Sequence, residues 1–123
     1  MNTFYAGTKF EIENCTRKGM QRFHLKYLLL HHGKFYILLD GIMLGDWRTI
    51  SWDMIRDIIL GDDEILSAKM FAIQTRLFFL KSAKPIKLLL TDGDVIYLYV
   101  NWNFGTGLSA NYKVYEKIKK NIK

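Results

Sequence analysis

The sequence predicts a mainly β domain with one α-helix, in which about seven antiparallel strands in two sheets are closed by a C-terminal amphipathic helix. Three observations support this fold class. Apolar and polar residues alternate with a period of two over much of the chain, as in strands with one buried face. Turn-forming dipeptides such as Asp92-Gly93 separate the runs. Residues 108–122 then change to a helical period.

In the first half of the chain, runs of alternating apolar and polar residues predict strands. These runs lie at Lys9–Glu13, Phe23–Leu29, Phe35–Leu39 and Ile42–Leu44. The dipeptides His32-Gly33 and Asp40-Gly41 are the predicted turns between them. After the last of these runs, Asp53 is expected to lie in a short turn of helix.

The second half of the chain repeats this pattern. Further strands are predicted at Ile65–Ile73, Thr75–Leu80, Ile86–Thr91 and Asp94–Val100. Between the last two, Asp92-Gly93 is the strongest hairpin signal, because a type I′ turn needs a positive φ angle at both central residues.

The C-terminal segment has apolar residues at intervals of three and four, which place them on one face of a helix. These residues are Leu108, Tyr112, Tyr115, Ile118 and Ile122. Ser109 is expected to cap the start of this helix by accepting a hydrogen bond from a free backbone N–H group.

The length of 123 residues and the absence of a Gly-rich or Ser-rich linker predict one domain over residues 1–123. Half of the residues are hydrophobic and 24% are charged, which excludes general disorder. The lone Cys15 excludes an internal disulfide framework and multi-cysteine zinc sites. The chain shows no signal peptide, and no apolar run reaches the about 18 residues of a spanning helix, so we expect a cytoplasmic protein.

No residue pattern predicts catalysis. The segment Gly105–Ala110 matches a dinucleotide-binding fingerprint, but the second strand and the acidic residue that the fingerprint requires cannot follow so close to the end of the sequence. His31 and His32 would point to opposite faces of a strand, and Cys15 has no predicted base nearby. The acidic run 62–64 lacks the spacing of a calcium loop. We therefore expect no enzyme, no cofactor and no metal site.

Positive charge and tryptophan are the features that indicate a binding surface. The net charge of +6 favours an anionic membrane or nucleic acid as partner, and tryptophan beside a cation suits the membrane–water interface. The candidate membrane- or ligand-binding residues are Trp47, Arg48, Trp102, Lys113, Lys117, Lys119, Lys120 and Lys123. Tyr97 and Tyr99 share one face of a predicted strand, where core packing is favoured over stacking on exposed bases.

Several segments of the chain resemble pleckstrin-homology-like (PH-like) domains of the bacterial PH and GRAM type. Residues Lys34–Ile42 look like a strand pair of this family, and Ile50–Ile55 look like the turn that precedes its second sheet. Residues Lys87–Val100 resemble the final hairpin, and Ser109–Ile122 resemble the closing helix. The resemblance implies a PH-like barrel that presents loops to lipids, peptides or proteins and has no common active site.

In size and charge, the chain is also similar to the small basic PH-like immunity proteins that protect producers of leaderless bacteriocins of the aureocin and lacticin type. This resemblance implies a peripheral protein at the inner face of the cell membrane, which either shields anionic lipid or binds the bacteriocin peptide. The alternative is a PH-like module that binds protein or nucleic acid without a membrane role. Nucleic acid is the weaker partner, because the chain has no aromatic motif of the RNA-binding type.

Overall fold

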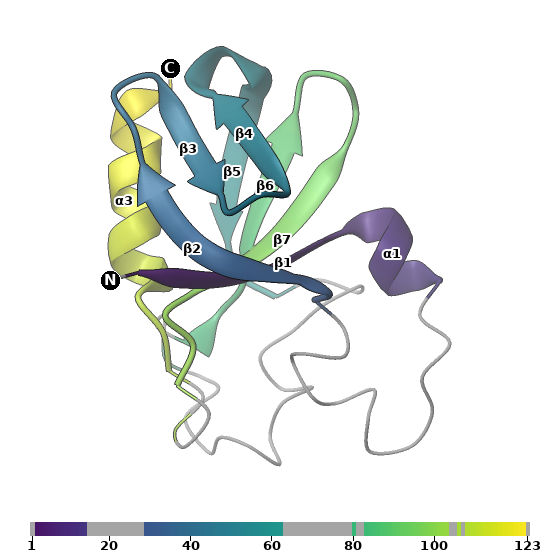
Figure 1. Cartoon of the computed structure of the whole chain (residues 1–123), viewed down its shortest axis with the longest axis vertical. Coiled ribbons are helices and arrows are strands. Elements are labelled where there is room, and N and C mark those ends of the chain that lie inside the picture. Colours follow the sequence, from purple (N-terminus) through teal and green to yellow (C-terminus); the bar gives the residue numbers. More distant parts are fainter. Residues whose placement is uncertain are drawn as a thin grey trace.

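In the computed structural model, seven antiparallel strands form one curled half-barrel, and a C-terminal helix packs against it (Figure 1). The structure describes residues 2–14, 29–62, 80, 83–103, 106 and 108–122. The strands are β1 (Thr3–Thr8), β2 (His31–Ile37), β3 (Gly41–Leu44), β4 (Arg48–Ser51), β5 (Ile55–Leu60), β6 (Ile86–Leu90) and β7 (Val95–Val100). The helices are α1 (Lys9–Glu13), the 3-10 turn η2 (Trp52–Met54) and α3 (Asn111–Asn121). The predicted fold class is confirmed, and the arrangement is consistent with a PH-like fold.

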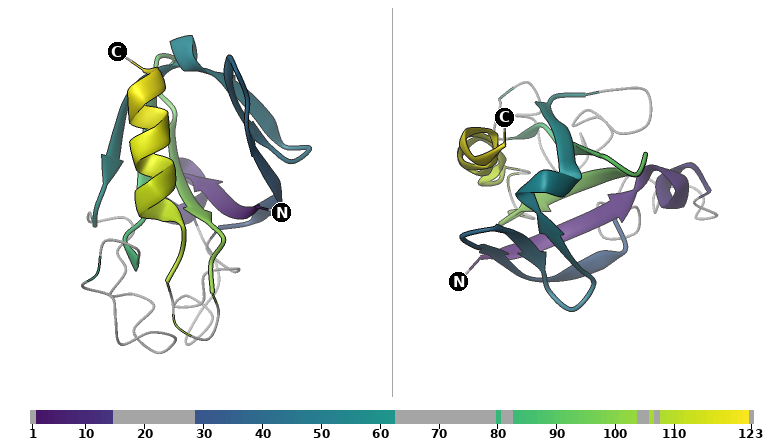
Figure 2. Two further views of the ribbon diagram at one scale, coloured as in Figure 1. Left: turned by 90° about the vertical axis from the view of Figure 1, so that its left-hand side faces the viewer. Right: turned by 90° about the horizontal axis from the view of Figure 1, so that it is seen from above.

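The strands follow the spatial order β4-β3-β2-β1-β7-β6-β5. Strand β1 pairs with β2 along one edge and with β7 along the other, so the two expected sheets are continuous through it. Helix α3 packs on β5 and β7 and runs along one side of the half-barrel (Figures 1 and 2). No helix in the described ranges is both long enough and apolar enough to cross a membrane.

Several predicted elements are confirmed. Asp40-Gly41 leads from the β2–β3 turn into β3, Asp53 lies in η2, and β6 and β7 form the hairpin around Asp92-Gly93. In that last turn, however, Gly93 has a φ of +96° whereas Asp92 has no positive φ angle, so the turn is not type I′. The N–H group of Gly93 instead donates to the carbonyl of Leu90.

The prediction of a strand at Lys9–Glu13 is wrong, because this segment is helix α1. Thr8 and Glu11 form a reciprocal capping box, in which each side chain accepts a hydrogen bond from the other residue's backbone N–H group. The strand in this region is β1, which comes directly before the helix.

The predicted turn at His32-Gly33 is also wrong, since both residues lie inside β2. Gly33 has a φ of +149°, a conformation that glycine adopts without a steric penalty, and it pairs with Phe4 of β1. Strands β1, β4 and β5 were not predicted. The strands expected at Phe23–Leu29, Ile65–Ile73 and Thr75–Leu80 lie outside the described residues, apart from Leu29 and Leu80 at their ends.

The inner core fills the concave side of the sheet and is closed by α3. Its buried members come from every strand and include Phe4, Phe35, Ile42, Ile50, Ile58, Leu88 and Leu98, together with Val114 and Ile118 of α3. The buried face of α3 is formed by Asn111, Val114 and Ile118, whereas Tyr112, which was expected on that face, is 38% exposed.

The buried polar residue Asn111 explains this difference between the predicted and the observed face of α3. Its Oδ1 accepts a hydrogen bond of 2.8 Å from the backbone N–H of Val100, and its Nδ2 donates to the carbonyls of Lys84 and Leu98 at 2.8 and 3.1 Å. The hydroxyl of Ser109 accepts a bond from the backbone N–H of Asn111, although the residue that precedes the helix is Ala110. Asn111 therefore fixes the start of α3 against the sheet.

We expect Asn111→Ala to lower the free energy of unfolding by about 2–4 kcal/mol, because it leaves the N–H of Val100 and two carbonyl groups without their partner in a buried site. Urea denaturation followed by circular dichroism measures this loss. Asn121→Ala is the matched control, since exposed Asn121 bonds only to the carbonyl of Lys117 and should change the stability by about 0.5 kcal/mol or less. Equal losses in the two variants would contradict this assignment.

Candidate functional site

Three lysines on α3 form one continuous exposed surface, which we call the lysine surface and define as Lys113, Lys117 and Lys120. Intervals of four and three residues place these side chains within one narrow sector of the helix. The neighbouring positions Val114 and Ile118 are buried, whereas all three lysines are exposed. The packing of Val114 and Ile118 against the sheet therefore leaves the lysine surface in solvent.

Lys119 lies on the flank of the helix and not on the lysine surface. Its Nζ donates a 3.0 Å hydrogen bond to the hydroxyl of Tyr115 and lies 5.3 Å from the centre of the Tyr115 ring. The hydrogen bond to Tyr115 is the largest cause that raises the pKa of Lys119 above its ordinary value. Lys119 thus remains fully charged at neutral pH, while Lys123 lies outside the described residues.

The positive charge of α3 is local. The described residues contain ten Lys or Arg and ten Asp or Glu, so the net charge of +6 is carried by the other parts of the sequence. On α3 itself, four lysines are accompanied by a single acidic residue, Glu116. The other described residues contain six basic and nine acidic side chains, so the helix is a strongly basic surface on a body whose described part has a formal charge of −3.

Trp47 and Arg48, the other predicted surface residues, lie on the opposite side of the described fold from α3, at the β3–β4 turn (Figure 2). The ring of Trp47 stacks on the imidazole of His31, with centroids 3.8 Å apart and planes 4° from parallel. The guanidinium of Arg48 lies 5.8 Å from the Trp47 ring centre and 3.3 Å from the carboxylate of Asp94. These two residues are therefore held by contacts within the protein.

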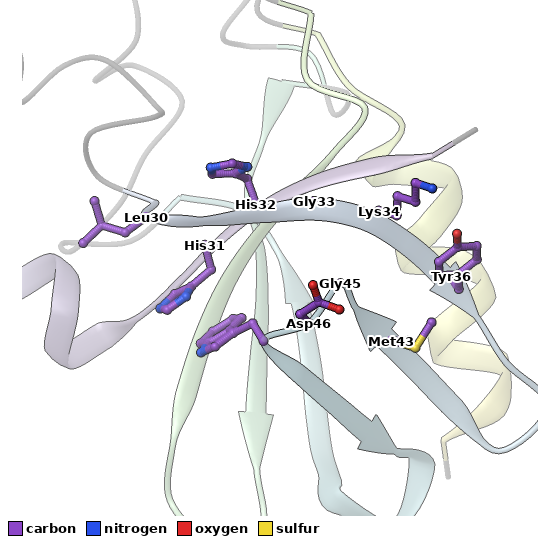
Figure 3. A pocket seen from close by; sticks show the side chains of 10 residues that line it. Leu30, His31, His32, Gly33, Lys34, Tyr36, Met43, Gly45 and Asp46 are labelled. Carbon is purple, nitrogen blue, oxygen red and sulfur yellow. The ribbon is translucent and has the colours of Figure 1, made fainter.

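An open groove of about 800 Å³ runs along β2 and past this stack, and we call it the β2 groove (Figure 3). It is lined by Leu30, His31, His32, Gly33, Lys34, Tyr36, Met43, Gly45, Asp46 and Trp47. Its lining combines aromatic rings with groups of both charges, so it has no single electrostatic preference. No group of three His, Cys, Asp or Glu side chains in the described residues is arranged to hold a metal ion.

Glu11 of α1 contacts the histidine of the stack formed by His31 and Trp47. Its Oε2 lies 2.7 Å from Nε2 of His31, while its Oε1 accepts the hydrogen bond from the backbone of Thr8. Partial burial opposes ionisation of Glu11, but the hydrogen bonds from Thr8 and His31 and the charge of His31 outweigh it and lower the pKa of Glu11. The ionised carboxylate is thus the form that suits this site.

Trp102, expected as a surface residue, is buried and only 7% exposed. It belongs to a second apolar cluster on the outer side of the sheet, with Ile12, Leu29, Tyr97 and Tyr99. The Trp102 and Tyr99 rings meet edge to face at 4.8 Å, and the Tyr99 hydroxyl donates to the carbonyl of Ala83. The expectation that Trp102 contacts a membrane is therefore corrected, whereas the expected core packing of Tyr97 and Tyr99 is confirmed.

The structure thus brings together Lys113, Lys117 and Lys120, and it places the β3–β4 turn with Trp47 and Arg48 on another side of the fold. Trp102 is buried in the second apolar cluster. The contacts of His31 could not be predicted from the sequence, because its partners Glu11 and Trp47 lie 20 and 16 residues away in the chain. No motif links these positions.

Comparisons with protein-family models, curated proteins and solved structures find no match to this chain.

The lowered pKa of Glu11 predicts a specific loss of stability in acid. A carboxyl group whose pKa is lower in the folded state stabilises the fold above its unfolded pKa of about 4.3, and this contribution is lost as the pH falls through the lower folded pKa. We expect wild type to be more stable than Glu11→Gln at pH 6, and we expect this difference to shrink between about pH 4.5 and pH 3.

Chemical denaturation of both proteins at a series of pH values tests this prediction. Glu13→Gln is the control on the same helix, because the Glu13 side chain is exposed and does not contact His31. A difference between wild type and Glu11→Gln that is constant from pH 6 to pH 3 would show that the ionised form of Glu11 is not favoured by the fold.

Proposed function

We propose that the protein is a non-enzymatic module that binds reversibly to an anionic membrane surface through α3. The lysine surface is the observation that carries this proposal: three exposed lysines, at successive turns of one helix, face away from the core. A cation near an anionic leaflet contributes about 1 kcal/mol, so these three residues supply about 3 kcal/mol toward docking. That energy suits peripheral and reversible contact.

The way in which α3 is attached to the body also supports docking. Val114 and Ile118 bury the inner face of the helix, and Asn111 bonds its first turn to β7. Because the helix cannot rotate about its axis without breaking these contacts, the three lysines face a flat surface together. A helix held in this way loses little conformational entropy when it docks.

The biological role that we propose is self-protection of a bacterial cell, at the inner face of its membrane, against a cationic membrane-active peptide. The resemblance to the immunity proteins of leaderless bacteriocins supports this role. A lysine surface would occupy anionic lipid headgroups that the peptide needs, and it would repel the peptide itself. Shielding of the membrane is therefore favoured over capture of the peptide. Capture of a cationic peptide would instead need acidic residues such as those of the run 62–64, in which Asp62 is already paired with Lys84.

Replacing the three residues of the lysine surface with glutamine should weaken binding to vesicles of phosphatidylglycerol and phosphatidylcholine by about a hundredfold at low ionic strength. Flotation or co-sedimentation of the full chain measures this affinity. Wild-type binding should also fall as salt is added, because screening shortens the range of the attraction.

The matched control replaces three lysines elsewhere, Lys9, Lys34 and Lys87, with glutamine and so changes the net charge by the same amount. It should keep most of the affinity for vesicles. Equal loss in both triple variants would indicate attraction by net charge and reject docking through α3. Binding that duplex DNA or RNA abolishes would favour the nucleic-acid alternative.

Protection can be tested in a sensitive bacterium that expresses the protein and is exposed to a cationic membrane-active peptide. Under shielding, changing the four described lysines of α3 to glutamate should abolish the rise in the inhibitory concentration, because the reversed charge repels anionic lipid. The four residues are Lys113, Lys117, Lys119 and Lys120. Full protection by this variant, together with loss of protection when residues 62–64 are neutralised, would instead show capture of the peptide.

A further inference from the structure

The turn between β2 and β3 presents a leucine to solvent almost completely. Leu39 is 98% exposed, and Ile37 at the end of β2 is 36% exposed. Single exposed apolar residues are common on protein surfaces. What distinguishes Leu39 is that its backbone is fixed and that it projects from the tip of a hairpin.

Three hydrogen bonds fix this turn. The N–H of Leu38 donates to the carbonyl of Gly41 at 2.7 Å and closes the hairpin. The backbone N–H of Trp52 donates to the carbonyl of Asp40 at 3.0 Å, and the indole Nε1–H of Trp52 donates to the carbonyl of Leu39 at 2.9 Å. The turn is therefore tied to η2, and the exposure of Leu39 is a built feature of the fold.

Gly41 keeps the turn close to β4. A side chain at this position would place its Cβ 2.1 Å from the carbonyl oxygen of Ile50, a distance that no side chain can occupy. Gly41 pairs with Ser51 at the end of β4, directly before η2. The close approach of these strands and the bonds from Trp52 thus act on the same short turn.

The turn and α3 reach the same side of the molecule. In Figure 1, the β2–β3 turn projects at the upper left, as far out as α3, and the view from above in Figure 2 again shows both along the left edge. These two views share the horizontal axis, and the view from above shows the turn and α3 set apart from each other along that edge. A flat surface on this side could therefore meet both elements. An apolar tip and a basic helix would then contact the same plane.

We propose that the β2–β3 turn inserts Leu39 into the upper acyl region of the membrane on which α3 docks. This inference rests on the function proposed above. An anionic bilayer fits both elements, because its headgroups attract the lysine surface while its interior accepts an apolar side chain. Asp40, exposed beside Leu39, limits the depth of insertion, since its carboxylate stays with water and headgroups.

A fluorophore at position 39 tests the insertion directly. The full chain carries Cys15→Ser and Leu39→Cys, and the new cysteine is labelled with an environment-sensitive nitrobenzoxadiazole group. On vesicles of phosphatidylglycerol and phosphatidylcholine, its emission should increase several-fold and should be quenched by lipids with a spin label near the headgroup. The control label at Glu13→Cys on α1, at the far side of the fold in Figure 1, should remain in water.

Unlabelled variants give a second measurement. Leu39→Asp should weaken vesicle binding about tenfold, because it removes the apolar contact and adds a negative charge, whereas Leu39→Met should bind like wild type. Asp40→Asn should bind more tightly than wild type. Because the side chains of Leu39 and Asp40 are both exposed, all three variants are expected to fold, and their thermal unfolding provides the check.

The outcomes separate the two proposals. If vesicle binding depends on the lysine surface while the label at position 39 stays in water and Leu39→Asp binds like wild type, the insertion is rejected and docking through α3 stands. If the wild-type chain does not bind anionic vesicles at low salt, both proposals are rejected. Quenching of the label at position 39, together with weaker binding of Leu39→Asp, supports insertion.

Discussion

Strand β1 is the element on which the rest of the structure depends, because it joins the two parts of the sheet. It pairs with β2 on one edge and with β7 on the other, which connects residues near the two ends of the sequence. Phe4 and Ala6 of β1 lie in the middle of the inner core. Once β1 is paired, β7 brings Leu98 and Val100 to Asn111, and the position of α3 follows.

Strand β2, placed by the same pairing, connects two features with different properties. At its start, His31 contacts Glu11 of α1 and Trp47 of the β3–β4 turn, through a hydrogen bond and a ring stack respectively. At its end, the chain turns with Leu39 in solvent and its backbone bonded to Trp52. The first feature turns a tryptophan and a histidine toward each other, whereas the second turns an apolar side chain away from the protein.

The sequence predicted the elements whose signals are local. The hairpin at Asp92-Gly93, the short turn at Asp53 and the C-terminal helix depend on nearby residues, and all three are present. The alternation at Lys9–Glu13 was too short to separate a strand from a helix, and the capping box of Thr8 and Glu11 decides for the helix. In the same way, the buried face of α3 could not be read from apolar residues alone, because polar Asn111 belongs to it.

The candidate site shows the same limit. The lysine surface was predictable because intervals of three and four residues determine its geometry once α3 forms. The environments of Trp47, Arg48 and Trp102 were not predictable, because they depend on distant contacts. These contacts are with β2 for Trp47, with the β6–β7 turn for Arg48 and with α1 for Trp102. Residue type suggested a binding surface for these side chains, but it could not show that Trp102 is buried or that Trp47 and Arg48 contact His31 and Asp94.

The balance of charge in the described fold determines what a membrane can recognise there. With equal numbers of basic and acidic residues, the described part of the protein has no net formal charge, so α3 is the part of it that would attract the anionic surface of our proposal. Screening would confine that attraction to about 8 Å at physiological ionic strength, so the helix would have to lie close to the headgroups. A basic helix alone would permit the body to tilt about the helix axis. A second contact at the β2–β3 turn would remove this freedom and give the bound protein one orientation.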